Sequence, residues 1–134
     1  MGSRDHLHGV PADWLAQAGL QGFRPDAASY PVGKNEHPDL PAPSIVRLAE
    51  IRPVSRSLGV RGLVEERTRS ILRAIAAGDP LPPIKLYAAP DGAFAYRLGE
   101  GFHRFTVSRA LGFEAIPAAV MTYWEPWMTG DPMP

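Results

Sequence analysis

The chain has 134 residues, with 14 basic and 14 acidic side chains and no formal net charge, and this length suits one domain with one core. The zero net charge argues against binding of nucleic acid or anionic lipid by bulk electrostatic attraction, although it is compatible with a local basic patch. There is no cysteine, which excludes disulfides, thiolate metal sites, thiol redox chemistry and cysteine nucleophiles.

The first 43 residues predict an irregular, proline-rich extension. Residues 10–18 have the pattern of a short helix with Pro11 near its start. Further prolines then interrupt the chain at positions 25, 31, 38, 41 and 43. Such a segment is typical of an arm draped on the domain or on a partner, or of a loose coil, and the pattern leaves these alternatives open.

A globular pattern begins at Ser44. Residues 44–51 alternate as a strand does, and Pro53 ends it because proline cannot continue a ladder. Residues 63–77 predict a helix that ends at Gly78. Its apolar stripe at helical spacing consists of Val64, Thr68, Ile71, Leu72 and Ile75.

The second half of the chain predicts a hairpin, a helix and a last strand. Residues 83–87 and 94–98 form the hairpin around a turn at residues 90–92. Residues 102–111 are the next helix and residues 116–121 the last strand. The tail over residues 123–134 is rich in tryptophan and proline.

These elements predict the fold class α/β, with a small mixed sheet and packed helices over residues 44–122. We expect the hairpin 84–98 to be central to that sheet. We expect the core to include Ile71, Ile75, Ile84, Leu86, Leu98, Leu111 and Val120. No apolar run approaches a membrane span and no signal-peptide pattern opens the chain, so we expect a cytoplasmic protein without a membrane partner.

The turn from Gly99 to Arg104 carries the main functional signal. Glycines allow positive φ and close backbone approach, and the start of a helix presents unpaired N–H groups to an anion. His103 and Arg104 add donors, and arginine binds phosphate with two parallel hydrogen bonds. Spacing alone leaves a second interpretation open, in which Arg104 is structural and pairs with a carboxylate such as Glu100 or Glu114.

Three further residues could complete a pocket around this turn. Arg52 lies at the end of the first strand, and Arg67 and Ser70 lie three residues apart on the 63–77 helix. For the two helix residues, spacing by itself favours a solvated face. The histidines have no metal-ligand spacing, so we expect no metal site, and no Walker-type loop or serine hydrolase elbow is present.

Residues 44–122 resemble the ParB/sulfiredoxin superfamily. The resemblance follows the order Ile51-Arg52-Pro53-Val54, Leu81-Pro82-Pro83-Ile84, Gly101-Phe102-His103-Arg104 and Ile116-Pro117. Sulfiredoxins carry a similar Arg-Pro segment, a Pro-Pro-Ile strand and a Gly-Cys-His-Arg turn. ParB N-terminal domains carry a Gly-Glu-Arg/His-Arg turn before a helix that ends near Leu-Gly and Ile-Pro.

The resemblance implies a site for the phosphates of a nucleotide, ATP or CTP, with or without Mg²⁺. The family's phosphate contacts fall on Arg52, His103 and Arg104, and Gly101 allows the approach. With one gap in the loop after the helix, Arg67 and Ser70 match positions that touch the nucleotide in sulfiredoxins.

Phe102 departs from both family patterns. It takes the place of the sulfiredoxin cysteine and of the ParB glutamate linked to nucleotide hydrolysis. A phenyl ring cannot attack a sulfinic acid, activate water or hold a metal, so we expect no sulfinic acid reductase activity. We also expect a chain of this length to lack the helix-turn-helix and dimerisation domains of a full partition protein.

Three functions remain open on the sequence. One is a nucleotide-phosphate-binding domain, with or without NTP hydrolase or phosphotransferase activity. Another is a DNA-associated ParB-like nuclease or DNA-binding accessory protein, which the zero net charge disfavours. The last is a non-catalytic protein that binds a partner through its N-terminal arm and its tail.

Overall fold

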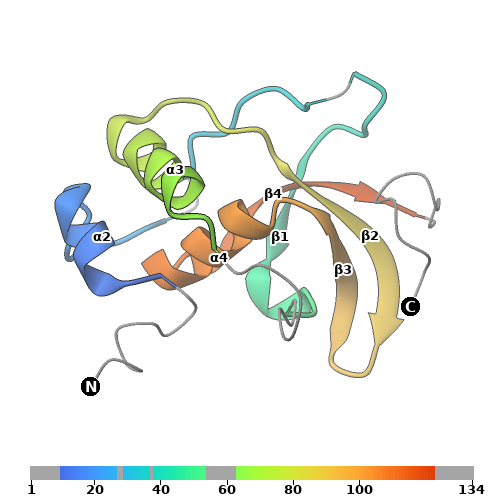
Figure 1. Ribbon diagram of the computed structural model, residues 1–134. Helices are drawn as coiled ribbons and strands as arrows, with labels where there is room; N and C mark the ends of the chain where they lie inside the picture. The colour runs from blue at the N-terminus through green and yellow to red at the C-terminus, as the bar shows by residue number, and fades with distance from the viewer. Residues whose placement is uncertain (1–9, 27–28, 37, 54–62, 123–134) are drawn as a thin grey trace.

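The computed structural model describes residues 10–26, 29–36, 38–53 and 63–122 (Figure 1). These residues form a small mixed α/β protein in which three α-helices accompany a four-stranded sheet. In chain order the elements are α2 (Ala12–Gln17), β1 (Ser44–Arg47), the 3₁₀ helix η2 (Leu48–Glu50), α3 (Glu65–Ala77), β2 (Ile84–Asp91), β3 (Phe94–Glu100), α4 (Phe102–Leu111) and β4 (Ala115–Met121). Residues 54–62 and the tail predicted over 123–134 lie outside the described residues.

The sheet has the strand order β1-β4-β2-β3. β4 pairs antiparallel with β1 and parallel with β2, while β2 and β3 form the antiparallel hairpin. The prediction of a central hairpin is therefore confirmed for β2, which lies between β4 and β3, and wrong for β3, which is the outermost strand on its side. The other interior strand is β4, whose residues Ile116–Ala119 are all buried, whereas every residue of β3 keeps some exposure. A strand that is buried throughout suits the middle of a sheet covered by helices.

The first strand is shorter than predicted. It ends at Arg47, because Leu48 turns inward and its N–H donates to the Glu114 carbonyl at 2.9 Å, which starts η2. After η2, Ile51 forms a parallel bridge to Tyr96 in β3, and the N–H of Arg52 donates to the Tyr96 carbonyl at 2.9 Å. The chain thus passes from one edge of the sheet to the other.

Helices α3 and α4 lie next to each other on one side of the sheet, with α2 beyond α3 (Figure 1). The centre of the core lies between these helices and the sheet. It is formed by Leu72 and Ile75 of α3, Phe105, Val107 and Leu111 of α4, and Ile84, Leu86, Ile116 and Ala118 of the strands. Along the described parts of the chain, no helix is long and apolar enough to cross a membrane.

The core prediction is confirmed for four of its seven residues. Ile75, Ile84, Leu86 and Leu111 are buried, whereas Ile71, Leu98 and Val120 are half-buried and pack against the core from outside. For Leu98 the reason is its place on the edge strand. For Ile71 it is the helix rotation, which points its neighbour Leu72 to the centre.

The described part of the N-terminal extension is draped on the domain, which was one of the alternatives left open. Val10, Leu20 and Tyr30 are buried in the same core as the sheet and helices. Arg69 of α3 holds α2 in two ways. It donates to Gln17 Oε1 at 2.5 Å, and its Cζ lies 5.1 Å from the centre of the Trp14 ring.

We predict that Leu72→Ala lowers the free energy of unfolding by about 2–5 kcal/mol, because the cavity and transfer terms add at a fully buried position. Ile71→Ala is the matched control. It removes a comparable side chain from the neighbouring, half-buried position and should cost clearly less. Urea unfolding of both variants measures the difference. Equal losses would mean that the faces of α3 are assigned wrongly.

Candidate functional site

The turn between β3 and α4 requires glycine at position 101. Gly101 is the N-cap of α4 and has φ 110° and ψ 33°, a conformation that side chains rarely adopt. A Cβ added there would lie 2.7 Å from Cγ2 of Ile84, closer than two carbons can approach. The start of α4 is therefore in direct contact with the start of β2.

His103 joins the first turn of α4 to the start of α3. Its Nε2 accepts a hydrogen bond from the Val64 N–H at 2.9 Å, and Val64 is the N-cap of α3. In a neutral imidazole whose Nε2 accepts, the proton is on Nδ1. Val64 has no capping side chain hydrogen bond of its own. His103 accepts from the N–H of the N-cap residue, as the third helical residue does in a capping box, and so satisfies one of the unpaired donors of this helix end.

This hydrogen bond brings the N-termini of two helices together. Each helix end carries a partial positive charge, and together they make an electropositive corner. The first turn of α4 contains no acidic residue. The first turn of α3 contains Glu65 and Glu66, of which Glu65 is paired with Arg69 at 2.7 Å.

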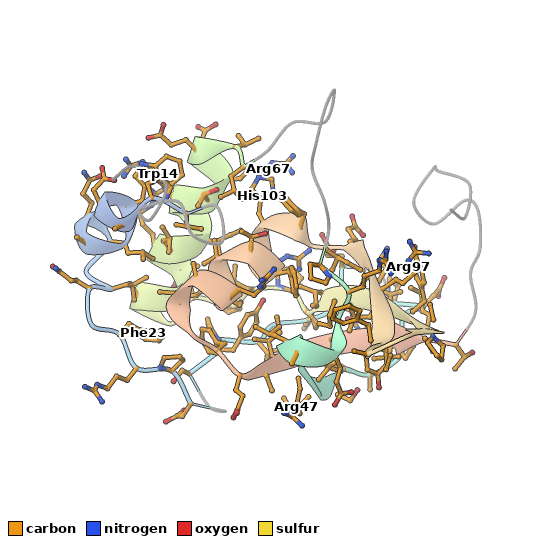
Figure 2. All side chains as sticks on the ribbon, turned by 90° about the horizontal axis from the view of Figure 1, so that it is seen from below. Trp14, Phe23, Arg47, Arg67, Arg97 and His103 are labelled. Atoms are coloured by element: carbon orange, nitrogen blue, oxygen red, sulfur yellow. The ribbon has the colours of Figure 1, made fainter. Side chains whose placement is uncertain are left out.

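The structure places Arg67 and Ser70 near this corner. Both lie on the N-terminal half of α3 with exposed side chains. Arg67 and His103 lie at the same end of the two helices (Figure 2). Within the described ranges no acidic side chain pairs with Arg67. The fold therefore brings Arg67 of α3 to the same end of the helical layer as His103 of α4.

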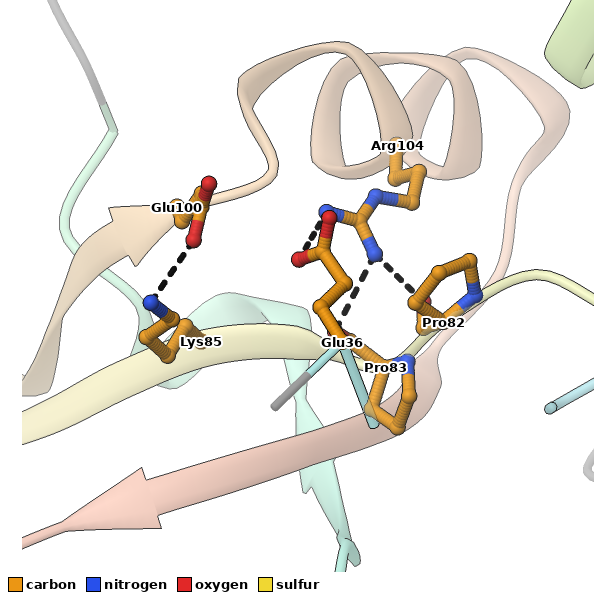
Figure 3. Close-up of polar contacts among 6 residues, drawn as sticks. All are labelled: Glu36, Pro82, Pro83, Lys85, Glu100 and Arg104. Atoms are coloured by element: carbon orange, nitrogen blue, oxygen red, sulfur yellow. Dashed lines mark hydrogen bonds and ion pairs between the residues drawn. The ribbon is translucent and has the colours of Figure 1, made fainter. Parts of the chain in front are cut away.

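Arg104 lies below the turn (Figure 3). Its Nη1 donates to the Pro82 carbonyl at 2.6 Å and to the Pro83 carbonyl at 3.1 Å, and its Nη2 lies 3.3 Å from Glu36 Oε1. Its side chain is 11% exposed. Arg104 thus connects α4 to the segment that enters β2 and to the N-terminal extension.

The second interpretation of the turn paired Arg104 with a carboxylate such as Glu100 or Glu114, and neither of these two is the partner. Glu36 of the extension is the partner instead. It comes within reach because the extension runs along the chain before β2, where the Gly33 N–H donates to the Leu81 carbonyl and the Leu81 N–H to the Pro31 carbonyl, both at 2.7 Å. Glu100 is occupied elsewhere.

Glu100 forms an ion pair with Lys85, which the sequence analysis missed. Lys85 Nζ lies 2.7 Å from Glu100 Oε1, and the lysine side chain is 9% exposed (Figure 3). A buried ammonium needs a partner, because burial without one costs several kcal/mol. The signal was present in the sequence, since Lys85 is the one charged residue in the apolar run Pro83–Tyr87.

Arg52 is exposed and lies beside β3. Because the bridge between Ile51 and Tyr96 is parallel, the chain at Arg52 runs in the direction of the Gly101 turn. Its backbone lies level with the middle of β3 and not at the end of the first strand, where we predicted it, because that strand ends at Arg47. No group of three potential metal-ligating side chains occurs among the residues that the structure describes.

Tyr30 is a second buried group close to Arg104. Its ring packs edge-on against Phe113 with the ring centres 5.8 Å apart, and its hydroxyl has no hydrogen-bond partner in the described part of the chain. Burial raises the pKa of the Tyr30 phenol from 10.0 to about 12, and the positive charge of Arg104 opposes that rise.

A comparison with known protein families and a comparison with curated proteins both find no match to this chain. What the site does must therefore be argued from its geometry.

We predict that Arg104→Ala lowers the free energy of unfolding by about 1–3 kcal/mol, because the carbonyls of Pro82 and Pro83 lose their donor. Arg104→Lys should keep part of the stability that Arg104→Ala loses, since an ammonium lacks the two parallel donors of the guanidinium. Arg73→Ala, at an exposed position of α3, is the control and should change stability by less than about 0.5 kcal/mol. If Arg104→Ala behaved like this control, Arg104 would not hold the turn.

We also predict an alkaline loss of stability that depends on Tyr30. The folded-state pKa is about 12 and the ordinary value is 10.0, so the folded protein holds the phenol proton more tightly than the unfolded chain does. The stabilisation is complete below pH 10 and is lost as the pH rises towards 12. Unfolding free energies measured across this window should fall more steeply for the wild type than for Tyr30→Phe. Identical slopes would contradict the burial of the phenol.

Proposed function

We propose that this chain binds the phosphates of a nucleotide, ATP or CTP, where the N-termini of α3 and α4 meet. The observation that supports the proposal best is the hydrogen bond from the Val64 N–H to His103 Nε2, because it brings two helix N-termini to one place. Each terminus favours an anion, and two of them suit the several charges of a polyphosphate.

The side chains around this corner have complementary roles in the proposal. Gly101 adopts the positive φ with which the chain enters α4, and so sets the direction of the first N–H groups of that helix. Arg67 offers a guanidinium that no described acidic residue neutralises, and Ser70 offers a hydroxyl one turn further along α3. Arg104 stabilises the turn and keeps its hydrogen bonds to the carbonyls of Pro82 and Pro83.

The order of elements supports a domain of the ParB/sulfiredoxin type. The Pro82-Pro83-Ile84 segment leads into β2, the Gly101-Phe102-His103-Arg104 turn joins β3 to α4, and Ile116-Pro117 lies in β4. These are the places that the resemblance assigns to the same motifs.

The proposal is for binding and includes no hydrolytic step. Phe102, at the position linked to catalysis in that superfamily, has a ring centre 5.5 Å from that of His103 and carries no group that could activate water or hold Mg²⁺. The nearby carboxylate of Glu100 is paired with Lys85.

Calorimetric titration with ATP, CTP and GTP, each with and without Mg²⁺, tests the proposal. Arg67→Ala should weaken binding by about 1.5 kcal/mol or more, roughly tenfold, because a charge-assisted hydrogen bond is lost. Arg73→Ala is the matched control on the same helix and should leave affinity unchanged. Both variants should keep the wild-type thermal midpoint.

Two results would contradict the proposal. One is the absence of any binding heat for the wild type at millimolar nucleotide. The other is an equal effect of Arg67→Ala and Arg73→Ala, which would mean that binding follows overall charge and not this corner.

A further inference from the structure

An apolar cavity of about 320 Å³ opens between η2 and the C-terminal half of α4, away from the Gly101 turn. Its described walls come from distant parts of the sequence. Leu48 begins η2 and Ile51 follows it, Phe94 begins β3, and Phe105 and Phe113 belong to α4 and the turn after it.

The walls are held in place by the rest of the fold. Ile51 is 1% exposed, Phe105 2% and Phe113 5%, so each is packed in the core behind the cavity. Backbone contacts anchor η2 on both sides, through the Leu48 N–H to the Glu114 carbonyl and through the Ile51–Tyr96 bridge. A hollow with rigid apolar walls is pre-formed, and ligand sites are usually of this kind.

Among the lining residues that the structure describes, Arg109 carries a charge. It lies in the last turn of α4 with its Cζ 5.5 Å from the centre of the Phe105 ring. Among the described residues, no carboxylate pairs with Arg109. Its guanidinium therefore stands beside an apolar hollow, stacked on an aromatic wall, with its hydrogen-bonding fork available.

We propose that this cavity binds a small monocarboxylic acid with an aromatic body. The ring would pack among the phenylalanines, and the carboxylate would accept two parallel hydrogen bonds from Arg109. The size is suitable, because a cavity of about 150 Å³ holds one benzene molecule and this one has roughly twice that volume. It can therefore hold a ring with a short carboxylate chain.

This site is separate from the proposed nucleotide site. Arg109 lies six residues after His103 on α4, or about 9 Å along the helix axis. A nucleotide phosphate carries several charges that apolar walls cannot solvate, whereas one carboxylate at the rim needs only Arg109. The inference holds whether or not the chain binds nucleotides.

Titration of the isotope-labelled protein with 3-phenylpropionate, followed by amide NMR shifts, tests the proposal. We expect saturable shifts around Ile51, Phe105 and Phe113, with a dissociation constant of about 1 mM or lower. The uncharged analogue 3-phenylpropanol should bind more weakly, and 3-phenylpropylamine, with its charge reversed, should not bind. Two results would overturn the proposal. One is the absence of shifts at roughly 10 mM 3-phenylpropionate, ten times the expected dissociation constant, and the other is equal binding of 3-phenylpropylamine.

Two variants separate charge recognition from simple apolar binding. Arg109→Met keeps an apolar stem but removes the charge, and it should weaken 3-phenylpropionate binding about tenfold while leaving 3-phenylpropanol unchanged. Ala49→Leu, at another lining position, should block both compounds by filling space. Arg73→Met is the control for a lost surface charge. Full carboxylate affinity in Arg109→Met would refute the assigned role of Arg109.

Discussion

The contact between Gly101 and Ile84 is the constraint on which the rest of this structure depends. Because Gly101 has no Cβ, the start of α4 lies directly on the first residue of β2. Arg104, one turn into the helix, then reaches the carbonyls of Pro82 and Pro83, which lead into the same strand. The position of α4 on the sheet is thus determined at its first turn, and both candidate sites depend on that helix.

Two long-range contacts extend from this first turn. His103 accepts from the N-cap of α3, and Arg104 reaches Glu36 in the N-terminal extension. The N-terminal extension, the start of α3 and the segment before β2 therefore meet around residues 101–104, although they are distant in the chain. The extension is part of this arrangement through Tyr30. The positive charge of Arg104 acts on the buried Tyr30 phenol, and the Tyr30 ring packs against Phe113, which follows α4.

The zero net charge of the chain conceals an uneven distribution of paired and available cations. Lys85, Arg69 and Arg104 each have a carboxylate partner, and all three join one element to another or stiffen a helix. Arg67 and Arg109 have none among the described residues, and they lie at opposite ends of the helical layer, beside a helix N-terminus and an apolar cavity respectively. Paired cations stabilise the fold, whereas Arg67 and Arg109 combine an unpaired charge with a neighbouring feature that suits an anionic ligand. The two proposals follow from this division.

The sequence by itself determined the local features of this protein. α4 begins after Gly101 and ends at Gly112, and α3 ends at Gly78. These helix limits, and the α/β class that follows from the order of periodic segments, can be predicted from neighbouring residues alone. The tertiary structure alone decided the strand order, the partner of Arg104, the capping role of His103 and the cavity beside Arg109. The residues in those contacts are far apart in the chain, 39 positions for Val64 and His103 and 68 for Glu36 and Arg104. Such pairs form only when the core brings their segments together, and no local pattern records which charge will meet which.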